Sequence, residues 1–108
     1  MQVSSTQWSA AEKEIVESAF LKAQHKEKEA VIQLVRQTVN EVSTLEDVWK
    51  LNDFLNSKRY EIEGKYDDQP AMLLFSLAAL IKDGWLSLQE LDGLDSDKLK
   101  KISALKQM

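Results

Sequence analysis

Residues 49–68 hold the densest group of side chains in this chain that could take part in polar recognition. As a helix at about 100° per residue, the run places an indole, two amides, a carboxylate and a guanidinium on one sector, which consists of Trp49, Asn52, Asp53, Asn56 and Arg59. A carboxylate and a guanidinium form paired, charge-assisted hydrogen bonds. This sector therefore favours recognition of another surface rather than the breaking of a bond.

The spacing of Asp53 and Arg59 argues against a bond within one helix. Neighbours on a helix surface lie three or four residues apart, whereas these two lie six apart. If two copies of the helix cross antiparallel about a two-fold axis near Asn56, Asp53 of each copy meets Arg59 of the other. We therefore predict a homodimer with this face at its seam, where Trp49 adds apolar area. A solvated face that carries a Trp by chance is the alternative that the periodicity leaves open.

His25 is the only histidine, and no motif places a nucleophile beside it. It lies in the polar run 24–29, where a solvated surface histidine is the simpler interpretation. The chain has no cysteine and no glycine-rich phosphate loop. We therefore predict no catalytic residue, no cofactor and no small-molecule substrate. The lack of a nucleophile–base pair disfavours a small helical enzyme.

Two groups of acidic residues could be ligands or acid–base pairs. Asp92, Asp95 and Asp97 resemble a loop of oxygen ligands, but they lack the spacing and the closing Glu of a calcium loop. The pair Asp67–Asp68 precedes Pro70, which is typical of an N-cap and first helical turn. Helix capping explains both groups, so we predict no metal site.

The composition predicts a single all-α domain over residues 1–108. Three Gly and one Pro leave few breaks for helices, and 44% hydrophobic with 30% charged residues is normal for a folded protein. A net charge of −4 argues against a general nucleic-acid binder. We find no secretory signal and no membrane-spanning run. We therefore expect a soluble intracellular protein, and peripheral association with a membrane stays open.

The first helix is predicted to be unusually long. Residues 1–8 are expected to be flexible, and Ser9 with Glu12 forms the pattern of a capping box. Apolar residues then recur every three or four positions to Val39, except over 24–29. One helix with a solvated middle is the preferred interpretation, and a hinge between two helices is the alternative. A helix of about 30 residues is about 45 Å long, so it needs a partner along its length.

A second capping box, at Ser43 and Glu46, opens the helix that carries the recognition sector, and Gly64 is expected to end it. The apolar sector of this helix is predicted to be part of the subunit's own core. It consists of Val48, Leu51, Phe54, Leu55 and Ile62.

Three shorter helices follow. The first, at about 69–83, is apolar nearly all round, so we predict that it is buried on most sides and ends at Gly84. Ser87 and Glu90 form a third capping box, which begins a short helix that ends at Gly93.

The last helix is capped by Asp95 or Ser96. Its predicted inner face consists of Leu99, Ile102 and Leu105. It also concentrates positive charge that could steer an acidic surface, in Lys98, Lys100, Lys101 and Lys106.

The run from Leu45 to Asp68 closely resembles the cyanobacterial fluorescence recovery protein family. The pattern W-x-L-x-D-F-L-x-x-K-R, which starts at Trp49, is followed by I-x-G-K-Y-D-D. The likeness continues through Phe75, the Lys82–Gly84 turn, Glu90-Leu-Asp-Gly-Leu94 and the Lys-rich end. It covers almost the whole chain after about residue 8.

The resemblance implies an all-helical homodimer that is not an enzyme. Long helices, at about residues 9–64 here, form a dimeric stalk, and the later helices, at about 65–108, form a head. The family binds the photoactivated red form of the orange carotenoid protein through that protein's C-terminal domain. It speeds the return to the orange form and promotes release from the phycobilisome, which ends photoprotective quenching. This implies a cytoplasmic location, peripheral to the thylakoid membrane.

The resemblance also implies roles for single residues. The family's important Trp, Asp and Arg match Trp49, Asp53 and Arg59, and its head aromatic and Lys match Phe75 and Lys101. We therefore expect a partner surface at Arg59, Phe75 and Lys101, although the apolar pattern alone predicts that Phe75 is buried. One departure is visible, because Asn52 stands where the best-known member of the family carries a His. A helical adaptor or assembly factor of the photosynthetic apparatus with another partner is the alternative function.

Overall fold

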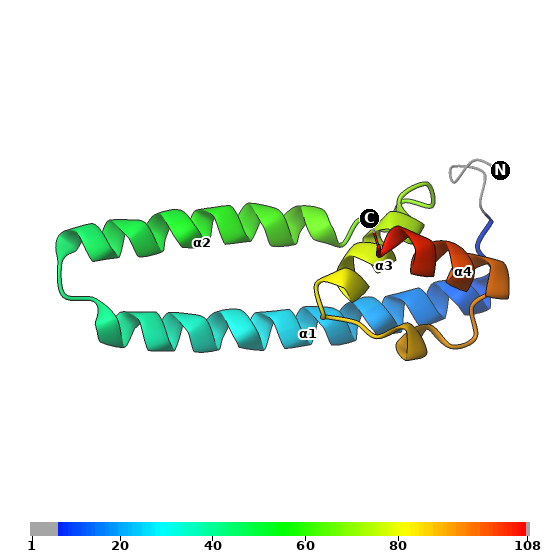
Figure 1. Cartoon of the computed structure of the whole chain (residues 1–108), viewed down its shortest axis with the longest axis horizontal. Coiled ribbons are helices and arrows are strands. Elements are labelled where there is room, and N and C mark those ends of the chain that lie inside the picture. The colour runs from blue at the N-terminus through cyan, green and yellow to red at the C-terminus, as the bar shows by residue number, and fades with distance from the viewer. Residues whose placement is uncertain (1–6, 108) are drawn as a thin grey trace.

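The computed structural model describes residues 7–107, and all regular secondary structure in that range is helical. They are α1 (Ala10–Glu41), α2 (Leu45–Lys65), α3 (Leu73–Lys82), the short 3-10 helix η2 (Leu88–Leu91) and α4 (Ser96–Leu105). The molecule measures 53 × 23 × 22 Å. The two long helices run side by side, and the shorter ones gather at one end around the start of α1 (Figure 1). The all-α prediction is confirmed.

The first helix is continuous, so the hinge alternative is wrong. Its capping box is present, because Ser9 Oγ accepts from the Glu12 N–H at 3.1 Å and Glu12 Oε1 accepts from the Ser9 N–H at 3.0 Å. The run 24–29 is helical but not fully solvated, since Glu27 is only 1% exposed. Of the predicted flexible N-terminus, residues 1–6 lie outside the described residues. Trp8 differs from that prediction because it is buried in the core.

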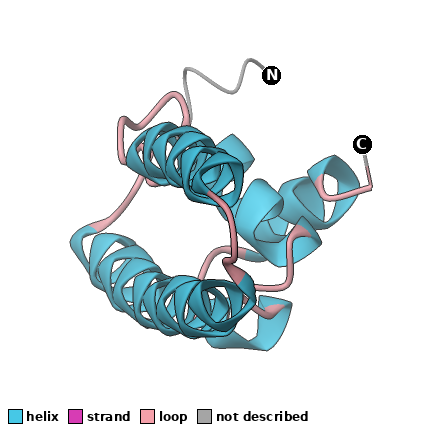
Figure 2. Ribbon diagram, turned by 90° about the vertical axis from the view of Figure 1, so that its left-hand side faces the viewer, coloured by secondary structure: helices cyan, strands magenta, loops and turns pink. Residues whose placement is uncertain are grey.

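The hydrophobic core lies at the end of the molecule where the short helices gather. Seen from the free end of the stalk, the two long helices appear end-on and the short helices lie to one side (Figure 2). The core members on the long helices all come from the first half of α1. The buried apolar residues are Trp8, Val16, Ala19, Phe20, Ala23, Leu73, Leu74, Leu77, Ala78, Leu80, Leu86, Leu91, Leu94 and Ile102. The first half of α1, which we assigned to the stalk, therefore packs with the head.

Helix α2 is capped one residue later than predicted. Thr44 Oγ1 accepts from the Asp47 N–H at 3.1 Å, and Asp47 Oδ2 accepts from the N–H groups of Thr44 and Ser43, each at 3.2 Å. Because Thr44 rather than Ser43 is the N-cap, the third helical residue that closes the box is Asp47 and not Glu46. The helix also runs through Gly64 to Lys65, and Gly64 has no positive φ. The predicted end at Gly64 is therefore wrong.

The predicted burial of the apolar sector of α2 is also wrong. No residue of α2 is buried within this single chain. Val48 and Phe54 are 40% and 42% exposed, and Leu51, Leu55 and Ile62 are half-buried. Within residues 7–107, no third helix runs along most of the stalk, so these side chains face mainly α1 (Figure 1).

The start of α3 differs from the predicted 69–83, and its end is confirmed. Asp67 Oδ1 accepts from the Gln69 N–H at 3.0 Å and Pro70 lies in a turn, so the helix begins only at Leu73. At the other end Gly84 has a φ of 86°. The Gly84 N–H donates to the Ile81 carbonyl and the Trp85 N–H to the Leu80 carbonyl. These two bonds form a Schellman motif, which requires the left-handed conformation that glycine tolerates.

The predicted boundaries of the last two helices are confirmed. The Ser87 N–H donates to Glu90 Oε1 at 3.3 Å, and Gly93, with a φ of 106°, follows η2. Asp95 caps α4 by accepting from the Asp97 N–H. On the inner face of α4, Ile102 is buried and Leu99 and Leu105 pack against the core.

A buried carboxylate joins the first turns of α1 and α4. Glu12 Oε1 accepts from Lys98 Nζ at 2.7 Å and Glu12 Oε2 accepts from the Asp95 N–H at 3.0 Å. Lys98 Nζ also lies 4.7 Å from the centre of the Trp8 ring. Lys98, which we predicted to steer an acidic surface, is thus a buried structural residue, and that prediction is wrong.

We expect Glu12→Gln to destabilise the fold in a pH-dependent way. Burial raises the pKa of Glu12, but the bonds from Lys98 and from the N–H groups of Ser9 and Asp95 outweigh it and lower that pKa from 4.5 to about 2. A lowered folded-state pKa stabilises the fold above pH 4.5, and this contribution is lost as the pH falls towards 2. Urea unfolding followed by circular dichroism should show a loss of about 2 kcal/mol at pH 7.

The difference between the native chain and Glu12→Gln should shrink as the pH falls from 4.5 to 2. Glu14→Gln, on the exposed side of the same helical turn, is the matched control and should change little. A difference between Glu12→Gln and the native chain that does not vary with pH would contradict the assignment.

Candidate functional site

The five residues of the predicted recognition sector are all exposed along α2. Trp49 has 56% of its surface exposed, and Asn52, Asp53, Asn56 and Arg59 are also exposed. By their positions on the helix Trp49, Asp53 and Asn56 face away from Leu51 and Ile62, which border the space between the two long helices, and Asn52 and Arg59 lie at the edge of this outer face. A Trp this exposed is unusual in a folded chain and indicates a contact surface.

Within one chain Arg59 pairs with a residue of its own helix. Its Nε lies 3.0 Å from Glu63 Oε1, four residues further on, and both side chains are largely exposed. Exposed pairs of this kind contribute little stability. Arg59 can therefore exchange Glu63 for a carboxylate on another surface at small cost.

Sequence reasoning missed Tyr60, which is 75% exposed. It follows Trp49, Asp53 and Asn56 in the i, i+4, i+7, i+11 pattern of one helix face. That spacing was the available signal, because an aromatic residue on an otherwise polar stripe extends the face of Trp49 by one more turn.

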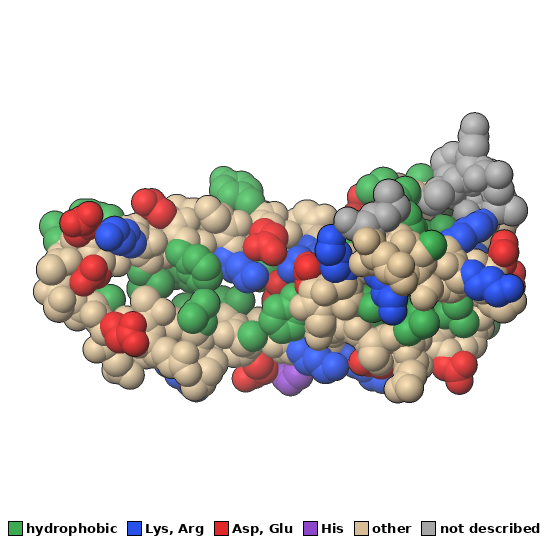
Figure 3. Space-filling model, in the orientation of Figure 1, with side chains coloured by type: hydrophobic (Ala, Val, Ile, Leu, Met, Phe, Trp, Pro, Cys, Tyr) green, Lys and Arg blue, Asp and Glu red, His purple; other side chains and the backbone are tan. Residues whose placement is uncertain are grey.

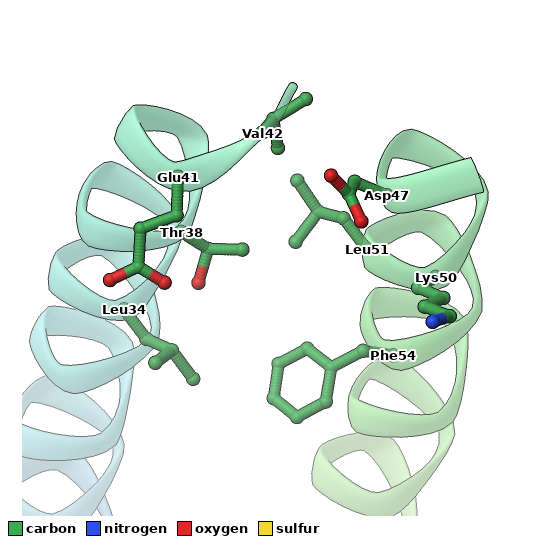
Figure 4. Close-up of a pocket in the computed structure, with 8 residues that line it drawn as sticks. All are labelled: Leu34, Thr38, Glu41, Val42, Asp47, Lys50, Leu51 and Phe54. Carbon is green, nitrogen blue, oxygen red and sulfur yellow. The ribbon is translucent and has the colours of Figure 1, made fainter. Parts of the chain in front are cut away.

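An apolar cleft separates the two long helices near the free end of the stalk. It has a volume of about 390 Å³ and is lined by Leu34, Thr38, Glu41, Val42, Asp47, Lys50, Leu51 and Phe54. Leu34 of α1 and Leu51 and Phe54 of α2 point toward one another across it (Figure 4). Hydrophobic side chains are visible between the long helices in the space-filling view (Figure 3). The stalk thus leaves apolar surface in contact with solvent, which favours a further partner.

Phe75 lies on the outer face of α3 and is 43% exposed. The helix is buried on most sides, as predicted, but the burial of Phe75 that the apolar pattern alone predicts is wrong. Met72, also 43% exposed, and Ala79 lie three and four residues away on the same face. Lys101 on the neighbouring α4 is half-buried and its Nζ lies 3.5 Å from Asp97 Oδ2.

A buried charged cluster at the base of the stalk was also missed. Glu27 of α1 accepts hydrogen bonds from Lys65 Nζ at Oε2 and from the Tyr66 hydroxyl at Oε1, the latter at 2.9 Å. Lys58 Nζ lies 3.6 Å from Oε2. Burial, followed by the bond to Glu27 and its charge, raises the pKa of Tyr66. The burial of Glu27 could have been inferred from its position, because it lies four residues after Ala23 in the apolar repeat of α1.

The described residues offer no metal-binding group of His, Cys, Asp and Glu side chains. His25 is exposed, as predicted. Asp95 caps α4 and Asp97 lies in its first turn, in agreement with the capping interpretation. Within residues 7–107, no helix combines the length and the apolar character needed to cross a membrane.

Comparison with known proteins gives consistent matches over nearly the whole chain. A family model described as "Photoprotection regulator fluorescence recovery protein" matches residues 8–106. The curated fluorescence recovery protein of Synechocystis is 38% identical over 105 residues, which are 97% of this chain and 96% of that protein. The solved fluorescence recovery protein of Fremyella diplosiphon is 51% identical with a TM-score of 0.90, and the Synechocystis structure is 38% identical with a TM-score of 0.90. Each match covers 94% of this chain and 100% of the solved chain.

We expect Phe75→Ala to leave the fold almost intact, because the side chain lies largely outside the core. The free energy of unfolding should change by less than about 1 kcal/mol. Leu74→Ala, the matched control, removes a fully buried neighbour and should cost about 3 kcal/mol. Denaturant unfolding of both variants measures these changes in the free energy of unfolding. Equal destabilisation by the two changes would show that Phe75 is a core residue.

Proposed function

Because this chain belongs to the fluorescence recovery protein family of photoprotection regulators, we propose that it binds the photoactivated red form of the orange carotenoid protein. It does so through the C-terminal domain of that protein and without covalent chemistry. Binding accelerates the return to the orange form and promotes release from the phycobilisome, which ends quenching. We place this activity in the cytoplasm, peripheral to the thylakoid membrane.

The exposure of Phe75 is the observation that carries the proposal. Its helix is otherwise well buried, since Leu74, Leu77 and Leu80 are each 0% exposed. An aromatic side chain that the core does not need can enter a pocket on a partner, which is how binding hot spots work. Arg59 and Lys101 add positive charge that suits an acidic partner surface.

A non-enzymatic protein can speed the relaxation of its partner only through differential binding. It must bind the transition state for reversion more tightly than the red form. A rigid head with one apolar anchor suits this task, because the anchor can stabilise one arrangement of the partner over another. No residue of this chain needs to react.

We also propose that the chain acts as a homodimer joined through α2. The support is that α2 has no buried residue and that Trp49 is exposed on its outer face. In an antiparallel crossing near Asn56, Asp53 of one copy replaces Glu63 as the partner of Arg59 in the other. Asn52 lies at the same seam, where its amide takes the place of the His expected from the resemblance.

For the regulatory function, we expect the chain to accelerate the red-to-orange absorbance change of photoactivated orange carotenoid protein in the dark. Phe75→Ala should reduce this acceleration by about tenfold or more, because a hot-spot residue is lost. Leu21→Ala removes an exposed apolar side chain from α1, 61% exposed against 43% for Phe75, and is the matched control. An unchanged reversion rate with molar excess of the native chain would overturn the function and favour the helical adaptor instead.

For the dimer, we expect Trp49→Ala and Arg59→Ala to lower the apparent mass in size exclusion with light scattering. The native chain should give about twice its 12.3 kDa. Lys50→Ala changes an exposed residue of the same helix outside the seam and should leave the mass unchanged. A native chain that is monomeric at micromolar concentration would refute the pairing.

A further inference from the structure

The hydrogen bonds and ion pairs that join α1 to α2 converge on one carboxylate. Across residues 7–107, Glu27 is the residue of α1 that makes every hydrogen bond and ion pair to α2 or to Tyr66, which caps α2. Its partners are Lys58, Lys65 and Tyr66. The Tyr66 ring then stands edge-on to Phe20, with ring centres 5.5 Å apart. The attachment of α2 to the head is therefore concentrated at the base of the stalk.

Packing adds little to this attachment elsewhere along α2. The helix has no buried residue. From Glu27 toward the free end of the stalk the two helices leave open space between them. A groove of about 610 Å³ adjoins Glu27 and is also lined by Val31, Ile32 and Ile62, and the 390 Å³ cleft lies at the free end. A helix held by few apolar contacts is among the first elements to open locally.

We propose that the cluster of Glu27, Lys58, Lys65 and Tyr66 is a latch that holds α2 against α1. When the latch opens, α2 separates as a unit while the head remains folded. The head does not depend on α2 for its core, since the core residues lie on α1, α3, η2, α4 and their connections. The latch is a property of the single chain, so it does not rest on the proposed function.

The position of the latch gives it a regulatory consequence. It lies between the exposed face of α2 and the turn that leads from Tyr66 to α3, where Phe75 is exposed. A partner that binds either the exposed face of α2 or the surface around Phe75 therefore acts on the same carboxylate, that of Glu27. Opening or closing of the latch sets how the stalk face is oriented relative to the head surface.

Hydrogen–deuterium exchange of the full-length chain, followed by mass spectrometry, tests the latch. Glu27→Gln should accelerate exchange in peptides from α2 by about tenfold or more, because a charge-assisted contact is lost. Exchange in α4 should stay as in the native chain. Tyr66→Phe, which removes one bond of the cluster, should give a smaller acceleration of the same peptides.

Two matched controls define the outcome. Glu61→Gln removes a carboxylate that pairs with Lys58 and Lys65 within α2 but does not contact α1, and it should leave α2 protected. Glu12→Gln removes the other buried carboxylate of α1 and should affect the start of α1 and α4 instead. Unchanged exchange of α2 in Glu27→Gln overturns the latch, and so does equal acceleration in every helix. A Glu61→Gln effect as large as that of Glu27→Gln also overturns it.

Discussion

The length of α1 is the constraint on which the rest of this structure depends. A helix of 32 residues spans about 48 Å, and a chain of this size can surround only part of it with a core. The shorter helices cover its first half, where Ala19 and Ala23 are fully buried. The second half has only α2 beside it. Two helices alone cannot enclose their apolar faces, which is why Phe54 and Val48 remain exposed and why the stalk suits a second copy of the chain.

Two buried carboxylates mark the ends of the covered half of α1. Glu12 binds Lys98 and the start of α4, and Glu27 binds Lys65 and the end of α2. An ionised group inside a protein is costly unless it is paired and hydrogen-bonded, and each of these is held by several donors. Each pair favours the observed placement of the helix it binds, because removing one partner would leave the other charge buried and unpaired. The head is fixed on α1 by the first pair, and the direction of the stalk by the second.

Local signals in the sequence were sufficient for most of the fold and insufficient for the site. The caps at Ser9 and Asp95 and the glycine turn at Gly84 depend on neighbours along the chain, so they could be predicted. The role of Lys98 depends on Glu12, 86 positions away, and no local pattern contains that pairing. The register of Glu27 in the apolar repeat of α1 could have indicated its burial, but its partners Lys65 and Tyr66, 38 and 39 positions away, could not be inferred from that local pattern. Helix α2 passes Gly64 because Lys65 and Tyr66 are anchored on α1, and this tertiary contact outweighs the local tendency of glycine to end a helix.

The exposed aromatic residues Trp49 and Phe75 lie on two separate surfaces of the chain. Phe75 lies over a complete core, so nothing in the fold requires a large apolar side chain at its position. Trp49 lies on a helix with no buried residue, so it cannot be explained by packing within one chain either. Exposing a large aromatic side chain to water is unfavourable, and a contact with another molecule removes that cost. Because the two residues lie on different helices, the proposed assembly at the stalk and the proposed recognition at the head use different aromatic side chains, and Arg59 alone is assigned to both.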